Sequence, residues 1–343
     1  MKVTVIVPIY QVEQYIGDCL NSVASQTYQG DIECLLVDDC GSDGSMALVN
    51  SFVESYTGKI QFKILHHACN RGLSAARNTG IVAATGDYLF FLDSDDELLP
   101  DCLSLLMEAV REKEYDMVIG DVVVVGDDRL KCVLTLKFLD GEVLRQPRIR
   151  YTYRHKWNAV AWNKLYRTDF VRENGLHFVE GLLFEDELWN FKVSFLLAGL
   201  RIVKHPTYIY RIRGDSITSA MDLQARVAHL TEIVKGMSRY VKEMGVPYDH
   251  DIHQRLQYFF SMVLEFAIRV GNYDERYREL RPYTKVSFGQ YLQFDGRSVF
   301  GLLRDFHYFL PTACGACWMR MFFDLVGITR RIRRKFRGYK LFR

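Results

Sequence analysis

The chain has 343 residues, of which 49% are hydrophobic, 13% aromatic and 25% charged. This length allows two domains or one large domain with an appendage, and the composition excludes collagen-like, low-complexity and disordered proteins. Eight of the 44 Lys and Arg residues lie between 329 and 343, where there is no Asp or Glu, so the preceding residues hold 36 basic side chains against 42 acidic ones. An acidic body with a basic tail excludes a general nucleic-acid-binding protein, whose basic surface should run through the fold.

The sequence carries no secretory or membrane-spanning pattern. It opens on a strand-like run at Val3–Val7 without a positively charged leader, and no apolar stretch reaches the roughly 20 residues of a membrane span. The eight cysteines are scattered, and a chain of this length does not need a disulfide scaffold. We therefore expect a cytoplasmic protein with reduced thiols.

Strand-like and helix-like patterns alternate over the first 125 residues. Short apolar runs predict strands, and apolar residues at helical spacing predict the helices between them. The predicted strands are 3–8, 34–37, 62–66, 88–92 and 117–125, and the predicted helices are 12–26, 45–56, 73–84 and 100–113. This alternation predicts an open α/β sheet of Rossmann type with right-handed crossovers, which binds ligands beyond the carboxyl ends of its strands.

The rest of the chain is organised differently. Residues 126–220 hold short motifs without long periodic stretches, whereas 222–245 and about 253–270 have the apolar spacing of long helices. We therefore predict a first domain over 1–220, a helical C-terminal region over 221–328 and a basic tail over 329–343.

Acidic residues stand at the ends of two predicted strands. Asp38-Asp39 ends the second strand, and Asp93-Ser94-Asp95-Asp96 ends the fourth. Carboxylates at 93 and 95 suit a hard divalent cation, which completes its shell with water and substrate phosphates. Because no P-loop and no G-x-G-x-x-G follows any strand, a metal ion would neutralise a diphosphate here. The pattern favours a nucleoside-diphosphate donor, and a solvated acidic turn that caps the next helix is the alternative.

Four motifs, in order and at the expected spacing, resemble the family 2 glycosyltransferases of the GT-A fold. They are Val5-Ile6-Val7-Pro8-Ile9-Tyr10, Leu36-Val37-Asp38-Asp39-Cys40-Gly41-Ser42-Asp43-Gly44-Ser45, Asn70-Arg71-Gly72-Leu73-Ser74-Ala75-Ala76-Arg77-Asn78 and Gly86-Asp87-Tyr88-Leu89-Phe90-Phe91-Leu92-Asp93-Ser94-Asp95-Asp96. The resemblance covers roughly residues 1–110, continues as short motifs to about 218 and is absent beyond. It departs from the family at Cys40, where a small residue is usual. It implies a Rossmann-like GT-A nucleotide-sugar-binding domain with a nucleotide-binding half over 1–110, an acceptor-binding half over 111–220 and a helical C-terminal extension.

The resemblance also implies a donor site in the first half of that domain. Pro8 and Tyr10 would line the pocket for the base, which is usually uracil. Asp39 would accept a hydrogen bond from the base, although capping of the turn is the alternative role for it. Arg71 would lie near the base or the ribose.

The chemistry of inverting sugar transfer needs a metal ion on one side and a base on the other. By resemblance, Asp95 would hold Mn²⁺ or Mg²⁺ on the diphosphate, and Asp93 would lie by the ribose and share the metal. The acceptor hydroxyl must lose its proton during the attack, so a carboxylate opposite the leaving group is the natural base. The segment at 184–189 resembles the family's Glu-Asp motif, which makes Asp186 the base and Glu185 its orienting neighbour or substitute. An acidic first helical turn that complements the helix dipole is the alternative.

Two later segments also resemble parts of these enzymes. Trp162-Asn163-Lys164-Leu165-Tyr166 resembles a segment of capsule and lipopolysaccharide glycosyltransferases. There Lys164 would contact the acceptor or the diphosphate, and a structural role for the Trp and Asn is the alternative. Tyr210-Arg211-Ile212-Arg213 resembles the family's last loop. Arg213 would make a charge-assisted contact to the diphosphate or, alternatively, a surface salt bridge.

Together these features predict an inverting, metal-dependent glycosyltransferase of surface polysaccharide synthesis. It would move a hexosyl or N-acetylhexosaminyl group from a UDP-sugar to a saccharide or lipid-linked hydroxyl. A sugar nucleotidyltransferase would instead need a Gly-rich basic loop after the first strand, where this chain has Tyr10-Gln11-Val12-Glu13. The third alternative is a non-catalytic nucleotide-sugar-binding or scaffold protein, and the carboxylates at 39, 93, 95 and 186 count against it.

The C-terminus suggests where the enzyme works. Residues 300–328 are rich in Phe, Leu and Met but too charged to span a bilayer, and the eight basic residues follow at once. Such a stretch suits lying in a membrane surface, where each basic residue near anionic lipid contributes ~1 kcal/mol. We expect a peripheral protein at the cytosolic face of a bacterial membrane, where a lipid-linked acceptor would stay. The alternative is that 300–328 packs on the catalytic domain and the tail is solvated.

Overall fold

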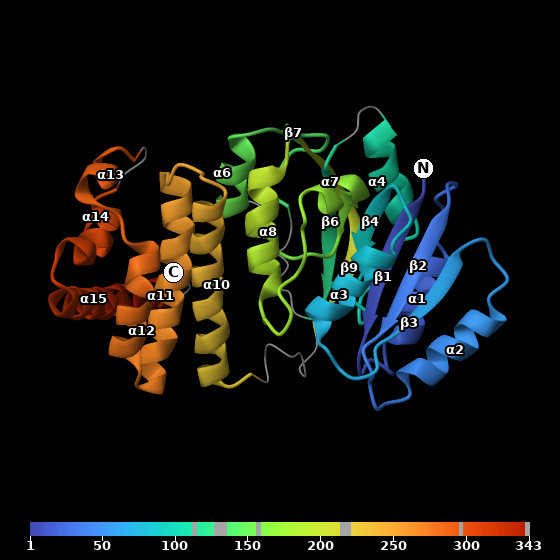
Figure 1. Cartoon of the computed structure of the whole chain (residues 1–343), viewed down its shortest axis with the longest axis horizontal. Helices are drawn as coiled ribbons and strands as arrows, with labels where there is room; N and C mark the ends of the chain where they lie inside the picture. The colour runs from blue at the N-terminus through green and yellow to red at the C-terminus, as the bar shows by residue number, and fades with distance from the viewer. Residues whose placement is uncertain (112–114, 127–135, 156–158, 213–220, 295–297, 340–343) are drawn as a thin grey trace. The chain divides into compact units, whose positions relative to one another are not determined.

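The computed structural model describes residues 1–111, 115–126, 136–155, 159–212, 221–294 and 298–339 (Figure 1). The chain divides into two compact units, Met1–Ala220 and Met221–Arg343. The first unit combines a sheet with helices, and the second is helical.

A mixed sheet of nine strands, counted over the described residues, forms the centre of the first unit. Its strands are β1 (Val3–Ile9), β2 (Ile32–Asp38), β3 (Gln61–His66), β4 (Tyr88–Phe91), β5 (Glu97–Leu98), β6 (Met117–Val125), β7 (Val143–Leu144), β8 (Lys164–Arg167) and β9 (Leu200–Arg211). Their order is β3-β2-β1-β4-β8-β6-β9-β5, and β7 pairs with β9. The strand β1 lies between β2 and β4, and its residues Val3, Val5, Ile6 and Val7 are 0% exposed. A strand buried on both faces requires the continuous apolar run from which it was predicted.

The helices of the first unit connect these strands. They are α1 (Ile16–Ala24), α2 (Ser45–Ser55), α3 (Leu73–Ala83), α4 (Cys102–Arg111), α6 (Arg148–His155), α7 (Thr168–Glu173) and α8 (Glu185–Leu196). Every strand and helix predicted for the first 125 residues is present, with somewhat different ends. In α1 the predicted apolar positions Ile16, Leu20 and Val23 are the buried ones, as an amphipathic helix on a sheet requires.

The Rossmann-type prediction holds for the strands predicted in the first 125 residues, because β1 to β4 are parallel and β6, separated from β4 by one antiparallel strand, runs in the same direction as β4. The strand β8 enters between β4 and β6 and is antiparallel to both, while β6 and β9 are parallel. The strand β8 was not predicted, because its four residues are too few to show the alternation of apolar and polar residues that marks a strand. The same inserted strand carries Lys164, which brings a charged side chain into the centre of the sheet.

The second unit contains the predicted long helices. Its elements are α10 (Leu223–Glu243), α11 (His250–Val270), α12 (Tyr273–Thr284), α13 (Phe288–Leu292), α14 (Val299–Asp305), the 3₁₀-helix η1 (Phe306–Phe309) and α15 (Thr312–Tyr339). Asp222 and Asp249 cap α10 and α11 by accepting from the amides of Ala225 and Ile252. Figure 1 shows α10, α11 and α12 side by side. Among the residues with a described placement, no helix is long and apolar enough to cross a bilayer.

Candidate active site

A buried arginine joins three carboxylates that are far apart in the sequence. Arg77, on α3, is 1% exposed. Its Nη2 donates to Asp93 Oδ1 at 2.8 Å, and its Nη1 donates to Glu185 Oε1 at 2.7 Å and to Asp186 Oδ1 at 2.9 Å. The structure thus brings the residue expected beside the ribose and the metal together with both residues expected to serve as the base.

The position of α3 explains why Arg77 is buried. Gly80 lies so close to β1 that an added Cβ would be 2.3 Å from Ile6 Cγ2. Arg77 precedes Gly80 by three residues and therefore points from the same face of the helix. Arg77 lies within one of the family-like motifs, but no role was predicted for it, and an Arg in a helix is usually exposed. The available signal was its place on a helix face made of small residues, with Ala76 and Gly80 on either side.

The first turn of α8 presents Glu185 and Asp186 to Arg77. Phe184, just before the helix, has a φ of 61°, a left-handed conformation that is unfavourable for a bulky residue. Asn190 Nδ2 donates to the backbone carbonyl of Asp186 at 2.8 Å, and the amide of Ala161 donates to its carboxylate. A strained backbone that is held in place by neighbouring hydrogen bonds is typical of functional sites.

The charges of this cluster do not balance. Burial raises the pKa of Glu185 to about 7 with the help of Asp186, although Arg77 opposes the rise. Burial also raises the pKa of Asp186, again against Arg77. Burial works against the charge on Arg77, yet the three carboxylates keep its pKa above the ordinary value. One permanent cation therefore faces three acids, and the surplus negative charge suits a cation or a proton acceptor.

Lys164 is a further member of this cluster and lies in the interior. It is 1% exposed, and its Nζ donates to the carbonyl of Val160. Burial lowers its pKa to about 7, and Asp186 opposes this shift. Strand β8 thus carries Lys164 into the sheet beside Asp186, and its expected contact with the acceptor or the diphosphate stays a prediction.

The alternative role for the neighbours of Lys164 is observed. The indole of Trp162 stacks on Tyr208 and Tyr210, with ring centroids 4.6 and 5.1 Å apart. Asn163 has a φ of 55°, and its side-chain amide donates to the carbonyls of Gly120 and Asp121. Both residues shape the turn that leads into β8.

Asp39 is 2% exposed and holds the loop before α3. Its Oδ1 accepts from the amide of Arg71 at 2.9 Å and lies 2.7 Å from His67 Nδ1, while its Oδ2 accepts from the amide of Gly72 at 2.8 Å. The amide of Asp39 donates to Ile9 at the end of β1, which places Asp39 beside Tyr10. The turn-capping alternative is therefore present in the structure, alongside any contact to a base.

The other residues expected at the base lie at the same sheet edge. Pro8 is buried within β1 opposite Val37, whereas Tyr10 is 39% exposed. The guanidinium of Arg71 points to Glu180 at 3.0 Å, and both side chains are 46% exposed. Cys40, the departure from the family pattern, has a φ of 59°, a conformation that costs less for a small or flexible residue.

The three aspartates after β4 differ in their surroundings. Asp96 is 1% exposed and accepts from the hydroxyl of Tyr208 and the amide of Arg211, both at 2.8 Å. Burial, together with Asp95 and Asp93, raises the pKa of Asp96 well above its usual range. Asp96 therefore has a structural role, whereas Asp93 and Asp95 are half-buried.

The donor set fits a metal ion that also binds its substrate. Over the described part of the chain, no three His, Cys, Asp or Glu side chains are grouped closely enough to hold a metal by themselves. Mg²⁺ and similar ions need only one or two carboxylates when substrate phosphates supply further ligands. Asp95 and Asp93 can meet that requirement together with a diphosphate.

The segment that resembles the family's last loop begins within a strand. Tyr210 and Arg211 end β9, and Arg211 Nη2 donates to Glu97 Oε1 at 2.6 Å. Since β9 continues alongside β6 as far as Arg211, the expected loop can begin only after this residue. Arg213, the expected diphosphate contact, lies outside the described residues.

Comparison with known proteins identifies the family. The family described as "Glycosyl transferase family 2" matches residues 4–175, half of the chain. EpsH of Bacillus subtilis, named a putative glycosyltransferase, is 32% identical over 225 residues, which are 63% of this chain and 62% of EpsH. TarS of Staphylococcus aureus, named a poly(ribitol-phosphate) beta-N-acetylglucosaminyltransferase, is 28% identical over 64% of this chain and 37% of TarS. The chain thus spans less than two thirds of either relative.

Solved structures share the fold. Residues 1–349 of S. aureus TarS, in complex with UDP, superpose with a TM-score of 0.60 and 22% identity over 91% of this chain and 81% of that one. The mannosyltransferase PcManGT from Pyrobaculum calidifontis, in complex with GDP-Man and Mn²⁺, gives a TM-score of 0.52 and 17% identity over 82% of each chain. These matches confirm the expected GT-A type of α/β fold with a helical C-terminal region. The chain belongs to glycosyltransferase family 2.

Proposed function

We propose that this glycosyltransferase is inverting, depends on a divalent metal ion and uses a UDP-sugar donor. It would transfer a hexosyl or N-acetylhexosaminyl group to a saccharide or lipid-linked hydroxyl during surface polysaccharide synthesis. The observation that carries this proposal is the Arg77 cluster, in which Asp93 and Asp186 bond to the same guanidinium. A direct displacement needs the leaving group and the attacking hydroxyl in one small space, and this cluster joins the side chains that would serve each.

Asp186 is the better candidate for the base. Its side chain is 19% exposed, compared with 7% for Glu185, so an acceptor hydroxyl reaches it more easily. As a carboxylate it would take the proton while the hydroxyl oxygen attacks the anomeric carbon and the diphosphate departs from the opposite face. Glu185, with a pKa raised to about 7, would exchange a proton with its neighbours and tune the charge of Asp186.

The donor would bind at the carboxyl ends of β1, β2 and β4, within residues 1–110. Asp39 already accepts two backbone amides and faces His67, and a carboxylate has about four acceptor positions, so one remains for the N–H of a base. Pro8 and Tyr10 would line the base pocket. Arg71 would leave Glu180 for the base or ribose, and an exposed ion pair of this kind costs less than ~1 kcal/mol to break. TarS fragments solved with UDP and with UDP-GlcNAc support a uridine donor.

The metal ion would bind to Asp95 and Asp93 and to the donor's diphosphate. When bound, it would stabilise the charge that develops on the leaving oxygens. The PcManGT complex, which contains Mn²⁺, supports a divalent metal in this fold. Arg213 remains the proposed contact to the diphosphate, and the acceptor would bind within 111–220.

Ligand-dependent melting tests the donor and the metal. A ligand at about 100 times its Kd stabilises a protein by ~2.7 kcal/mol, so UDP should raise the Tm in the presence of Mn²⁺ more than GDP or dTDP does. Asp95→Ala should abolish the part of the UDP effect that depends on Mn²⁺, and Asp101→Ala, on an aspartate just beyond the site, is the matched control. If no nucleotide changes the Tm, the scaffold alternative is favoured. An Mn²⁺ effect that persists in Asp95→Ala would contradict the metal site.

We also propose a peripheral location at the cytosolic face of a membrane. Exposed apolar side chains gather on α14 and α15, with Val299 77%, Phe300 58%, Met321 59% and Leu325 57% exposed. The rings of Phe300 and Phe322 lie 5.1 Å apart, so these two helices present their apolar side chains close together. The eight basic residues of the tail follow in the sequence and favour anionic lipid.

Vesicle co-sedimentation tests this location with the full chain. We expect salt-sensitive binding to vesicles that contain phosphatidylglycerol, and Met321→Ser with Leu325→Ser should weaken it about tenfold or more, because each buried apolar side chain contributes ~1.5–3 kcal/mol. Val82→Ser is the control, since Val82 is 81% exposed on the first unit. Equal loss of binding in both variants, or no binding by the native chain, would contradict the proposal.

A further inference from the structure

The helical unit has a pocket that the proposed reaction does not use. It has a volume of about 420 Å³ and lies among the last turns of α10 and α12, the connection from α10 to α11, and α13. This volume is within the ~300–1,000 Å³ range of small-molecule sites. The lining combines an apolar floor with aromatic and polar groups, including Val241, Tyr248, Tyr283, Lys242, Lys285 and Gln290.

Two lysines of this pocket have no carboxylate partner among the described residues. Lys242 and Lys285 are exposed, and no ion pair of either is found within the described ranges. The ammonium of Lys242 lies 5.9 Å from the ring centroid of Tyr283. Lys235, on the same helix as Lys242, contrasts with both, because its Nζ lies 2.9 Å from Glu232 and 2.7 Å from Glu279. The pocket therefore carries uncompensated positive charge beside two tyrosine rings.

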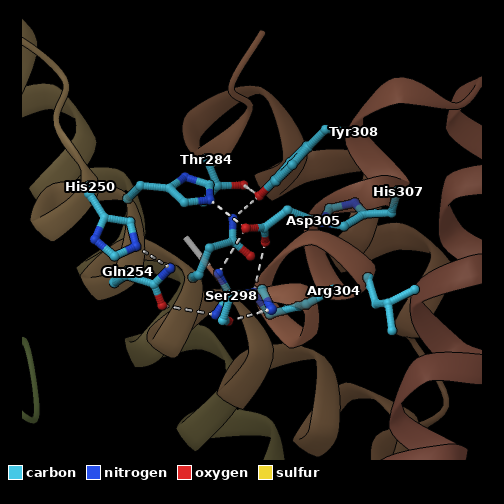
Figure 2. Close-up of polar contacts among 12 residues, drawn as sticks. His250, Gln254, Thr284, Ser298, Arg304, Asp305, His307 and Tyr308 are labelled. Atoms are coloured by element: carbon cyan, nitrogen blue, oxygen red, sulfur yellow. Dashed lines mark hydrogen bonds and ion pairs between the residues drawn. The ribbon is translucent and has the colours of Figure 1, made fainter. Parts of the chain in front are cut away.

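A buried polar network holds one wall of the pocket in place. The hydroxyl of Tyr248 lies 3.2 Å from His253 Nδ1 and donates to the carbonyl of Thr284 at 3.4 Å. His253 Nε2 in turn lies 2.9 Å from Asp305 Oδ2, and both of these residues are 0% exposed. Figure 2 shows Asp305 against Arg304, whose Nε donates to Asp305 Oδ1 at 2.7 Å. Because these hydrogen bonds already fix Tyr248, its side chain loses little conformational entropy when a ligand binds.

We propose that this pocket binds an anionic saccharide, a sugar ring that carries a carboxylate or a phosphate. Tyr283 and Tyr248 would cover the apolar face of the ring, and Gln290 would meet its hydroxyls. The ammonium groups of Lys242 and Lys285 would bind the anionic group as point charges. The pocket lies wholly within the second unit, so it would hold a sugar of a glycan chain independently of UDP-sugar binding.

The experiment is ligand-observed NMR titration of the full chain, without nucleotide, using four probes. Glucuronic acid and glucose 6-phosphate test the two sources of negative charge, while glucose and inorganic phosphate each lack one half of the proposed ligand. We expect at least one acidic sugar to bind more than tenfold more tightly than glucose and than phosphate, and more weakly at high ionic strength.

Three variants separate the pocket from other basic surface. The double variant Lys242→Ala with Lys285→Ala should lose about tenfold or more of the affinity for the acidic sugar. Tyr283→Ala should weaken the acidic sugar while leaving any affinity for phosphate unchanged. Arg278→Ala, on the exposed side of α12, is the matched control and should bind as the native chain does.

Several results would overturn the proposal. Equal binding of glucose would show that the lysines do not select an anion, and binding of phosphate alone would show an unspecific anion site. Unchanged affinity in the double variant, with native melting behaviour, would place the sugar elsewhere. No binding of any probe would leave the lysines as charges that complement the carbonyl ends of α10 and α12. None of these outcomes affects UDP-dependent melting, which tests the transfer reaction.

Discussion

Each unit of the molecule contains a buried charge network, and the two differ in balance. In the helical unit, Asp305 is 0% exposed and meets one guanidinium, Arg304, and one imidazole, His253. Burial lowers the pKa of His253 although Asp305 opposes it, so the imidazole is neutral near pH 7 and the charges cancel. In the first unit, one guanidinium meets three carboxylates, and the side chains of Asp93 and Asp186 remain 24% and 19% exposed. A buried network whose charges cancel has a structural role. A partly exposed network with surplus charge is typical of a site that binds a ligand or catalyses a reaction.

Removal of Arg77 should have the largest effect on stability and turnover, because Arg77 is the one permanent cation of the unbalanced network. In Arg77→Met, three acids would remain in the interior without their cation, and we expect a loss of about 3–5 kcal/mol in the free energy of unfolding. Urea unfolding measures this loss. Turnover should also be lost, which a transferase assay checks under conditions where the variant is folded. A variant as stable and as active as the native chain would show that Arg77 organises nothing.

Removal of Asp305 should be nearly as destabilising but should leave catalysis alone. Asp305→Ala leaves the half-buried Arg304 guanidinium without its carboxylate, and we expect a loss of about 3 kcal/mol in unfolding free energy. The Kd for UDP, measured by calorimetry below the melting transition, should stay within about twofold of native. If Asp305→Ala weakened UDP binding as strongly as Arg77→Met, the two networks would not have separate roles.

The pH dependence of stability should report on Glu185. Its pKa is raised from 4.5 to about 7 in the folded chain, so the folded state binds more protons than the unfolded state between those values. Stability should therefore fall as the pH rises from about 4.5 to 7. Glu185→Gln should flatten this part of the curve, as measured by denaturant unfolding at a series of pH values. A curve of unchanged slope in Glu185→Gln would assign the titration to another group.

The smallest effect is expected at the exposed pair of Arg71 and Glu180. Each side chain is 46% exposed, so Glu180→Gln should change the unfolding free energy by less than ~1 kcal/mol. The same variant should bind UDP at least as tightly as the native chain, because Arg71 no longer has to leave a partner. Tighter or equal binding in calorimetry would agree with a donor contact by Arg71, and clearly weaker binding would contradict it.

The parts predicted from the sequence are those with local signals. The apolar run of β1 and the aspartates that follow β2 and β4 could be placed because strand ends and turns are encoded by neighbouring residues. The alternative given for Glu185 and Asp186, an acidic first turn of a helix, is also where the structure has them.

The parts that were missed depend on contacts distant in the sequence. The bonds from Arg77 to Glu185 and Asp186 span 108 and 109 residues, and no local pattern shows that an arginine on a helix is buried. The insertion of β8 between β4 and β6 depends on the order of strands in the sheet, so the sequence did not show that Lys164 is buried. The contact of His253 with Asp305 spans 52 residues, and no local sequence pattern predicted it either.

The most direct test of the central claim is the turnover of Asp186→Asn. Asparagine keeps the shape of the side chain and an oxygen for Arg77 but cannot take a proton. We expect turnover of a UDP-sugar to fall ~10²–10⁴-fold, the usual contribution of a positioned base, while the Kd for UDP stays native. Glu187→Gln, in the same helical turn, is the control and should retain turnover. Near-native turnover in Asp186→Asn would contradict the assignment and place the base elsewhere.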